Sequence, residues 1–121
     1  RQICGGTPAV ALNATHRVAF GHVTRNRRYY TVFAYVFEAQ SPFRMVACSK
    51  EFRFHGLAGE SSIDFDVATR PEIEDMIQFP VGLVVDGDQL LVSWGRDRNR
   101  ETRASSLRLA ELGLARLPRL E

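Results

Sequence analysis

Residues 79–97 read FPVGLVVDGDQLLVSWGRD, and near the start of the chain residues 5–10 read GGTPAV. Each stretch sets a turn-forming Gly or Pro element beside an apolar run, and the longer stretch has two apolar runs around a tight turn. Asp-Gly between apolar runs is a strong signal for a β-hairpin. We therefore predict that strands over 77–85 and 89–95 pair across the turn at Asp86-Gly87-Asp88.

The first third of the chain also has the pattern of successive strands. Residues 29–38 alternate aromatic and β-branched residues and give the clearest strand prediction in the chain. Further strands are expected over 7–12, 17–23 and 43–49, with a turn at Ser41-Pro42. Four successive antiparallel strands with short turns are what one blade of a β-propeller requires.

A long connection and a mixed C-terminal stretch complete the chain. Residues 50–76 exceed the usual length of a loop, so they are either functional or contain small elements of their own. Residues 102–109 are predicted to be a third strand, or a strand that passes into a helix. The composition of residues 106–117 favours a short C-terminal helix, although the spacing of its leucines is mixed.

The fold class expected from these patterns is all-β, a partial β-propeller with about one complete four-stranded blade and most of a second. Its chemistry is expected at the strand ends that face the central channel. The expected division is a blade over 1–49, a connecting loop over 50–76, an incomplete blade over 77–109 and a tail over 110–121. The chain has 121 residues and begins with Arg1, which suggests a segment of a longer polypeptide.

Composition excludes several classes of protein. A net charge of +2, from 16 basic and 14 acidic residues, is too small to indicate a nucleic-acid partner. No apolar run approaches the roughly 18 residues of a membrane span, and no signal peptide is visible. The compartment stays open, with the cytoplasm favoured. Cys4 and Cys48 lack metal-ligand spacing and are expected to be free thiols.

The order of the motifs resembles the C-terminal part of the five-bladed β-propeller glycosidases and phosphorylases. The similarity rests on GGTPAV, a strand ending in Gly21-His22, Tyr30 opening the next strand, Ser-Pro-Phe and residues 79–97. It covers about residues 4–100. Within that group the chain is most similar to the β-mannoside phosphorylase family, glycoside hydrolase family 130, and its glycosyltransferase-associated relatives. It departs from the family pattern at several positions, among them Val81, where the family has Thr.

The resemblance implies a set of binding residues. His22 falls at a strand-end histidine that contacts phosphate or the sugar, and Tyr30 at a tyrosine that helps hold the same anion. Asp97 falls at a sugar-orienting aspartate, and Thr7 at a threonine near the channel. The resemblance places the catalytic acid in earlier blades, so no catalytic residue and no metal ligand is expected here. The isolated chain is expected to be inactive, and no cofactor is implied, with inorganic phosphate as the possible co-substrate.

The chemistry of these side chains leaves alternatives open. A protonated histidine donates from both ring nitrogens and can hold an anion, but His22 can equally be satisfied by a backbone carbonyl. Tyr29 and Tyr30 point to opposite faces, so only one of them can serve the site. Asp97 can be an exposed turn residue among arginines. Trp94 can stack on a sugar, although a core position is favoured.

The expected function is to supply part of the sugar and phosphate pocket of a glycoside phosphorylase or hydrolase acting on mannosides or similar oligosaccharides. The alternative is a non-catalytic carbohydrate-binding or accessory propeller module associated with a glycosyltransferase. A structural β-sandwich fragment without a ligand is a third hypothesis. The expected partners are an oligosaccharide or glycoside and the remaining blades or a covalently linked domain, with no nucleic acid and no membrane.

Overall fold

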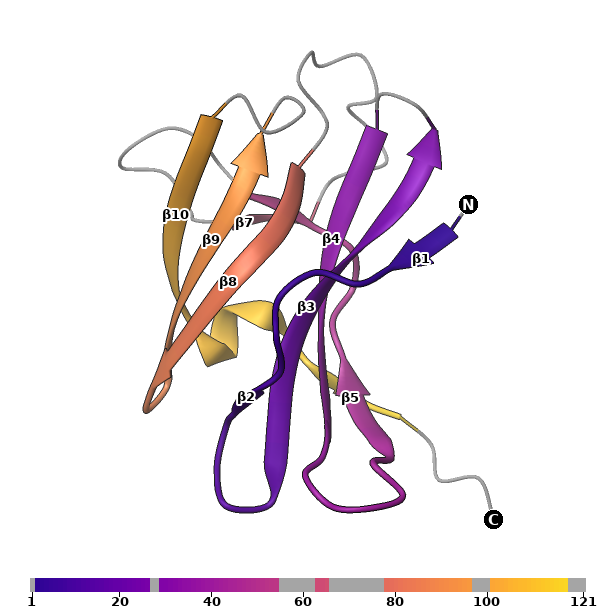
Figure 1. Cartoon of the computed structure of the whole chain (residues 1–121), viewed down its shortest axis with the longest axis vertical. Coiled ribbons are helices and arrows are strands. Elements are labelled where there is room, and N and C mark those ends of the chain that lie inside the picture. Colours follow the sequence, from indigo (N-terminus) through magenta and orange to yellow (C-terminus); the bar gives the residue numbers. More distant parts are fainter. Residues whose placement is uncertain (1, 27–28, 55–62, 66–77, 97–100, 118–121) are drawn as a thin grey trace.

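Antiparallel β-strands form most of the chain in the computed structural model, which describes residues 2–26, 29–54, 63–65, 78–96 and 101–117 (Figure 1). The all-β class is therefore confirmed. The strands are β1 (Gln2–Cys4), β2 (Val10–Ala11), β3 (His16–Asn26), β4 (Tyr29–Glu38), β5 (Met45–Cys48), β6 (Arg53–Phe54), β7 (Ile63–Asp64), β8 (Gln78–Asp86), β9 (Gln89–Arg96), β10 (Glu101–Arg108) and β11 (Ala115–Arg116), with a 3-10 turn η1 (Leu109–Leu112).

The larger sheet has six strands in the order β1-β3-β4-β5-β11, with β2 also paired to β3. Its centre is the long antiparallel hairpin of β3 and β4, and the observed bounds of β4 agree with the strand predicted over 29–38. The predicted strand over 7–12 is shorter in the structure, because only Val10 and Ala11 pair with β3. β1 was not predicted from the sequence.

The smaller sheet has three strands in the order β10-β9-β8. The predicted hairpin is confirmed, since Asp86 pairs with Gln89 across the turn and Gly87 has a φ of 62°. Positive φ costs glycine little, which is why Asp-Gly suits this turn. A register shift between Pro80 and Gly82 marks a bulge in β8.

The two sheets pack face to face, with β8 against β3 and β4. They diverge toward the β8–β9 turn, where η1 lies between them (Figure 1). The short β6–β7 pair adds aromatic side chains to the interface, and the ring of Phe54 stacks on Trp94 with centroids 5.1 Å apart. The buried core consists of Phe20, Val32, Ala34, Phe52, Phe54, Ile63, Leu90, Val92, Trp94, Leu107 and Leu112.

The predicted helix over 106–117 is wrong. β10 continues to Arg108 because Leu107 pairs with Leu90 and faces the core. Only the single turn of η1 follows, and it ends at Gly113, whose φ of 56° is left-handed. β11 then pairs with β5. A mixed leucine spacing is what such a succession of strand, turn and strand produces.

The described parts of the long connection, residues 50–54 and 63–65, contain β6 and β7. The hypothesis that this connection contains small elements of its own therefore holds for those residues. Cys4 and Cys48 are free thiols, as expected.

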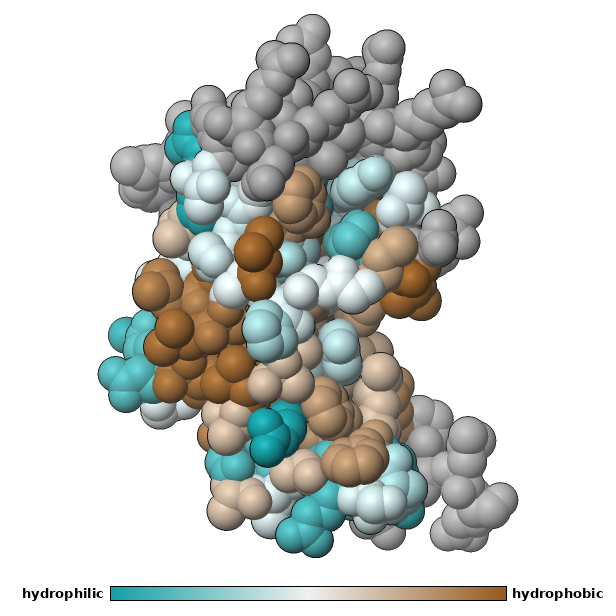
Figure 2. Space-filling model, in the orientation of Figure 1, coloured by the Kyte–Doolittle hydropathy of each residue, from teal (hydrophilic) through white to brown (hydrophobic). Residues whose placement is uncertain are grey.

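The outer face of the smaller sheet exposes apolar side chains. Val84 and Leu91 are cross-strand partners and are 59% and 49% exposed, and Val81 is 50% exposed. Figure 2 shows apolar atoms gathered over this hairpin. Within the part of the chain that is described, no helix has the length and hydropathy needed to span a membrane.

Candidate functional site

The Gly-Gly-Thr-Pro motif, residues 5–8, connects β1 to β2 and runs beside β3. Thr7 holds it there with two hydrogen bonds to Phe20: the Thr7 N–H donates to the Phe20 carbonyl at 2.9 Å, and the Phe20 N–H donates to Thr7 Oγ1 at 2.9 Å. Thr7 is only 7% exposed. Its backbone and side chain thus replace the strand pairing that is interrupted between β1 and β2, which makes Thr7 a residue that positions its neighbours.

His22 is fixed by the same stretch. Its Nδ1 lies 2.8 Å from the carbonyl oxygen of Gly5. Because a carbonyl only accepts, we assign the proton to Nδ1, so that Nε2 is an acceptor in the neutral ring and a donor once the ring is protonated. The hypothesis of a histidine satisfied by a backbone carbonyl thus holds for one of its two ring nitrogens.

Tyr30 lies against His22. The two rings stack with centroids 5.3 Å apart and planes 19° apart. This contact follows from the register of β3 and β4: Thr24 pairs with Tyr30 and His22 with Val32, so the two rings are diagonal neighbours on one face of the sheet. Both side chains are half-buried.

Small polar groups surround this pair on the same face. Cys4 is the cross-strand partner of His22, and its Sγ lies 3.8 Å from Thr24 Oγ1. We call Cys4, His22, Thr24 and Tyr30 the His22 cluster. It offers an aromatic surface, the phenol of Tyr30, the hydroxyl of Thr24 and the Nε2 of His22, which accepts a hydrogen bond in the neutral ring and donates one in the protonated ring. These four side chains include no carboxylate. Among the described residues, no group of three or more His, Cys, Asp or Glu side chains could hold a metal ion.

The remaining predicted residues have different outcomes. Asp97 lies outside the described residues, so its place relative to the His22 cluster stays a prediction. Trp94 is 1% exposed, and its indole N–H donates to Ser105 Oγ at 2.9 Å. Its core position is confirmed, and burial excludes stacking on a sugar.

Sequence reasoning did not single out a second polar surface at the opposite end of β3. His16, Glu38, Arg44 and Arg116 line a hollow of about 680 Å³ there. Arg116 reaches it because β11 pairs with β5. No local signal in the sequence indicates that pairing, and the tail was predicted to be helical.

Comparison of the chain with protein-family models, with curated proteins and with solved structures gives no match. The geometry of these residues is therefore the basis for a functional proposal.

Proposed function

We propose that this chain contributes a wall of the oligosaccharide-binding pocket in a five-bladed β-propeller protein that resembles the β-mannoside phosphorylases. The observation that carries the proposal is the stacked pair of His22 and Tyr30, with His22 oriented by the Gly5 carbonyl. Gly5, His22 and Tyr30, which come from separate motifs, thus meet at one end of the larger sheet. In this proposal the meander of β1, β3, β4 and β5 is one blade, and β8 to β10 are most of the next.

The chemistry of the pair suits a sugar. Sugar hydroxyls both donate and accept hydrogen bonds, so they match the Nε2 acceptor of His22 and the hydroxyl of Tyr30. Protonation of the imidazole turns Nε2 into a charged donor, which suits a phosphate oxygen. A single pair can therefore contact a glycoside and an attacking phosphate.

Catalysis needs groups that the His22 cluster lacks. Hydrolysis of a glycosidic bond requires two carboxyl groups, one to protonate the leaving oxygen and one to activate water. Phosphorolysis dispenses with the second carboxylate but still needs the acid. The cluster is therefore assigned a binding role, with the acid supplied by another part of the propeller.

The same lack of a carboxylate favours a second candidate, a non-catalytic carbohydrate-binding module associated with a glycosyltransferase. The two candidates differ in turnover and agree in binding. An enzyme consumes phosphate when it is given a β-mannoside and forms mannose 1-phosphate, whereas a binding module holds the oligosaccharide unchanged.

Titration with β-1,4-mannobiose and with inorganic phosphate, followed by NMR, tests the binding role. We expect His22→Ala to abolish saturable binding. Tyr30→Phe keeps the ring stack and removes one hydroxyl, so it should weaken binding by about threefold to tenfold. Tyr35→Phe is the matched control, because Tyr35 lies on the opposite face of β4. Unchanged affinity in His22→Ala would overturn the proposal.

A further inference from the structure

The hollow at the far end of β3 is built by strand pairing. Val36 pairs with Ala47, and Ala47 in turn pairs with Arg116, which places the three side chains on one face of the sheet. His16 and Glu38 are cross-strand partners on that same face. The Leu117 N–H donates to the Val46 carbonyl at 2.9 Å and holds the end of β11 in place.

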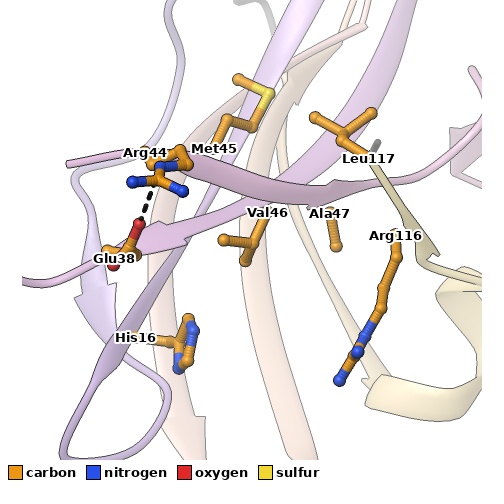
Figure 3. A pocket seen from close by; sticks show the side chains of 8 residues that line it. All are labelled: His16, Glu38, Arg44, Met45, Val46, Ala47, Arg116 and Leu117. Atoms are coloured by element: carbon orange, nitrogen blue, oxygen red, sulfur yellow. Dashed lines mark ion pairs between the residues drawn. The ribbon is translucent and has the colours of Figure 1, made fainter. Parts of the chain in front are cut away.

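Figure 3 shows how the side chains lie. Val46 and Ala47 project from β5 on the same side as Arg116, and they form an apolar floor. The imidazole of His16 lies on one side of this floor and the guanidinium of Arg116 on the other. A hollow of about 680 Å³ is within the size range of small-molecule sites.

Two arginines line the hollow, and one of them, Arg44, is paired with a carboxylate. Arg44 Nε lies 3.4 Å from Glu38 Oε1, so these two groups largely neutralise each other. Within the described residues Arg116 forms no ion pair, and it is exposed. Two arginines against one glutamate give the hollow a net charge of +1 while His16 is neutral. This balance favours a monoanion over a dianion.

His16 has a defined hydrogen-bonding state. Thr15 Oγ1 lies 3.0 Å from Asn13 Oδ1 and donates to it, because an amide oxygen only accepts. The same hydroxyl oxygen lies 2.8 Å from His16 Nδ1, so Nδ1–H donates to Thr15. Nε2 is left without a proton in the neutral ring, and it donates to an anion only when the ring is protonated.

We propose that this hollow binds a small monocarboxylate with a short apolar tail. The carboxylate is held by the planar fork of Arg116, with the imidazole of His16 across the hollow, and the tail lies on Val46 and Ala47. His16 lies six positions before His22 along β3, a span of about 20 Å. The hollow is therefore a site distinct from the His22 cluster, and it stands whether or not that cluster binds a sugar.

Titration of the chain with n-butyrate, followed by backbone amide shifts, tests the proposal. We expect saturable shifts at Val46, Ala47 and Arg116, with no such shifts for n-butyramide, the neutral analogue of butyrate. Arg116→Gln should weaken butyrate binding by at least about tenfold. Arg17→Gln is the matched control, because Arg17 is exposed on the opposite face of β3, and it should change affinity by less than about twofold.

A variant of His16 separates the roles of the two side chains that flank the apolar floor. The charged groups that face His16 are Glu38 and Arg44, which pair with each other, and Arg116. Because the carboxylate is assigned to Arg116, His16→Gln should weaken butyrate binding by less than Arg116→Gln does.

Three results would overturn the proposal. The first is the lack of any saturable shift with butyrate in the unmutated chain, a measurement that needs no variant to fold. The second is equal binding of inorganic phosphate or butyramide, which would exclude a carboxylate site. The third is equal loss of affinity in Arg17→Gln and Arg116→Gln, which would indicate a general effect of charge.

Discussion

The side chain of Gln78 holds the backbone of Phe54 by two hydrogen bonds. Gln78 Oε1 accepts from the Phe54 N–H at 2.8 Å, and Gln78 Nε2 donates to the Phe54 carbonyl at 3.0 Å. Gln78 is 6% exposed, so both bonds lie away from water. The amide thus acts as a one-residue strand partner that joins β8 to β6 and seats Phe54 on Trp94.

Gln78→Glu tests this link, because a carboxylate can replace the acceptor but not the donor. The ionised group would face the Phe54 carbonyl in a buried position, which raises the pKa of the introduced carboxyl above its unfolded value of about 4.3. The protonated form restores the donor. The variant should therefore be close to the unmutated protein below about pH 4 and lose about 2–4 kcal/mol of unfolding free energy by about pH 8.

Urea unfolding at the two pH values measures this difference. Gln89→Glu is the control, since Gln89 is exposed at the start of β9 and the same substitution there should change stability by less than about 0.5 kcal/mol. A Gln78→Glu deficit that is the same at both pH values would contradict the bidentate role.

The two adjacent glycines of the first motif differ in the space around them. A Cβ on Gly6 would lie 2.7 Å from Pro80 Cγ and would overlap the Phe20 carbonyl oxygen, whereas a Cβ on Gly5 would meet nothing within 4 Å. Gly6→Ala should therefore cost at least about 2 kcal/mol, and Gly5→Ala less than about 1 kcal/mol. Thermal unfolding of the two variants makes the comparison, and equal melting temperatures would refute it.

Thr7→Val removes a buried acceptor while it nearly preserves volume. The Phe20 N–H would lose its partner, which costs about 1–3 kcal/mol. Thr7→Ser keeps the hydroxyl and should lose less. Hydrogen exchange gives the specific readout: the Phe20 amide should exchange faster in Thr7→Val but stay protected in Thr7→Ser. Equal protection in both variants would show that the hydroxyl is not the partner that matters.

The parts of the fold that follow from local patterns are those that the sequence predicted well. The strand over 29–38 alternates strongly, and the Asp86-Gly87-Asp88 turn sets the register of its hairpin without help from distant residues. The pairing of β1 with β3 and of β11 with β5 involves strands of two or three residues, and nothing local specifies such short, distant partners.

The same distinction applies to the candidate sites. The contact of His22 with Tyr30 needs only the register of one hairpin, so two strand-end residues singled out from the sequence do meet. The approach of Arg116 to His16 needs β4, β5 and β11 to assemble side by side. The helix predicted over 106–117 would not pair Arg116 with β5, so the sequence pattern did not indicate this site.

The hydrogen bond between Trp94 and Ser105 can be tested in the interior of the smaller sheet. The indole N–H of Trp94 donates to Ser105 Oγ at 2.9 Å, and Ser105 is 8% exposed. Ser105→Ala leaves that N–H buried without its acceptor, which should cost about 1–3 kcal/mol. Ser106→Ala, on the exposed outer face of β10, should cost less than about 0.5 kcal/mol.

The chain has one Trp, so its fluorescence follows unfolding of both variants directly. Because that ring packs on Phe54 inside the core, added mannobiose should leave its emission unchanged in the folded protein. Equal stability of the two alanine variants would show that the hydrogen bond contributes nothing to the packing of this sheet.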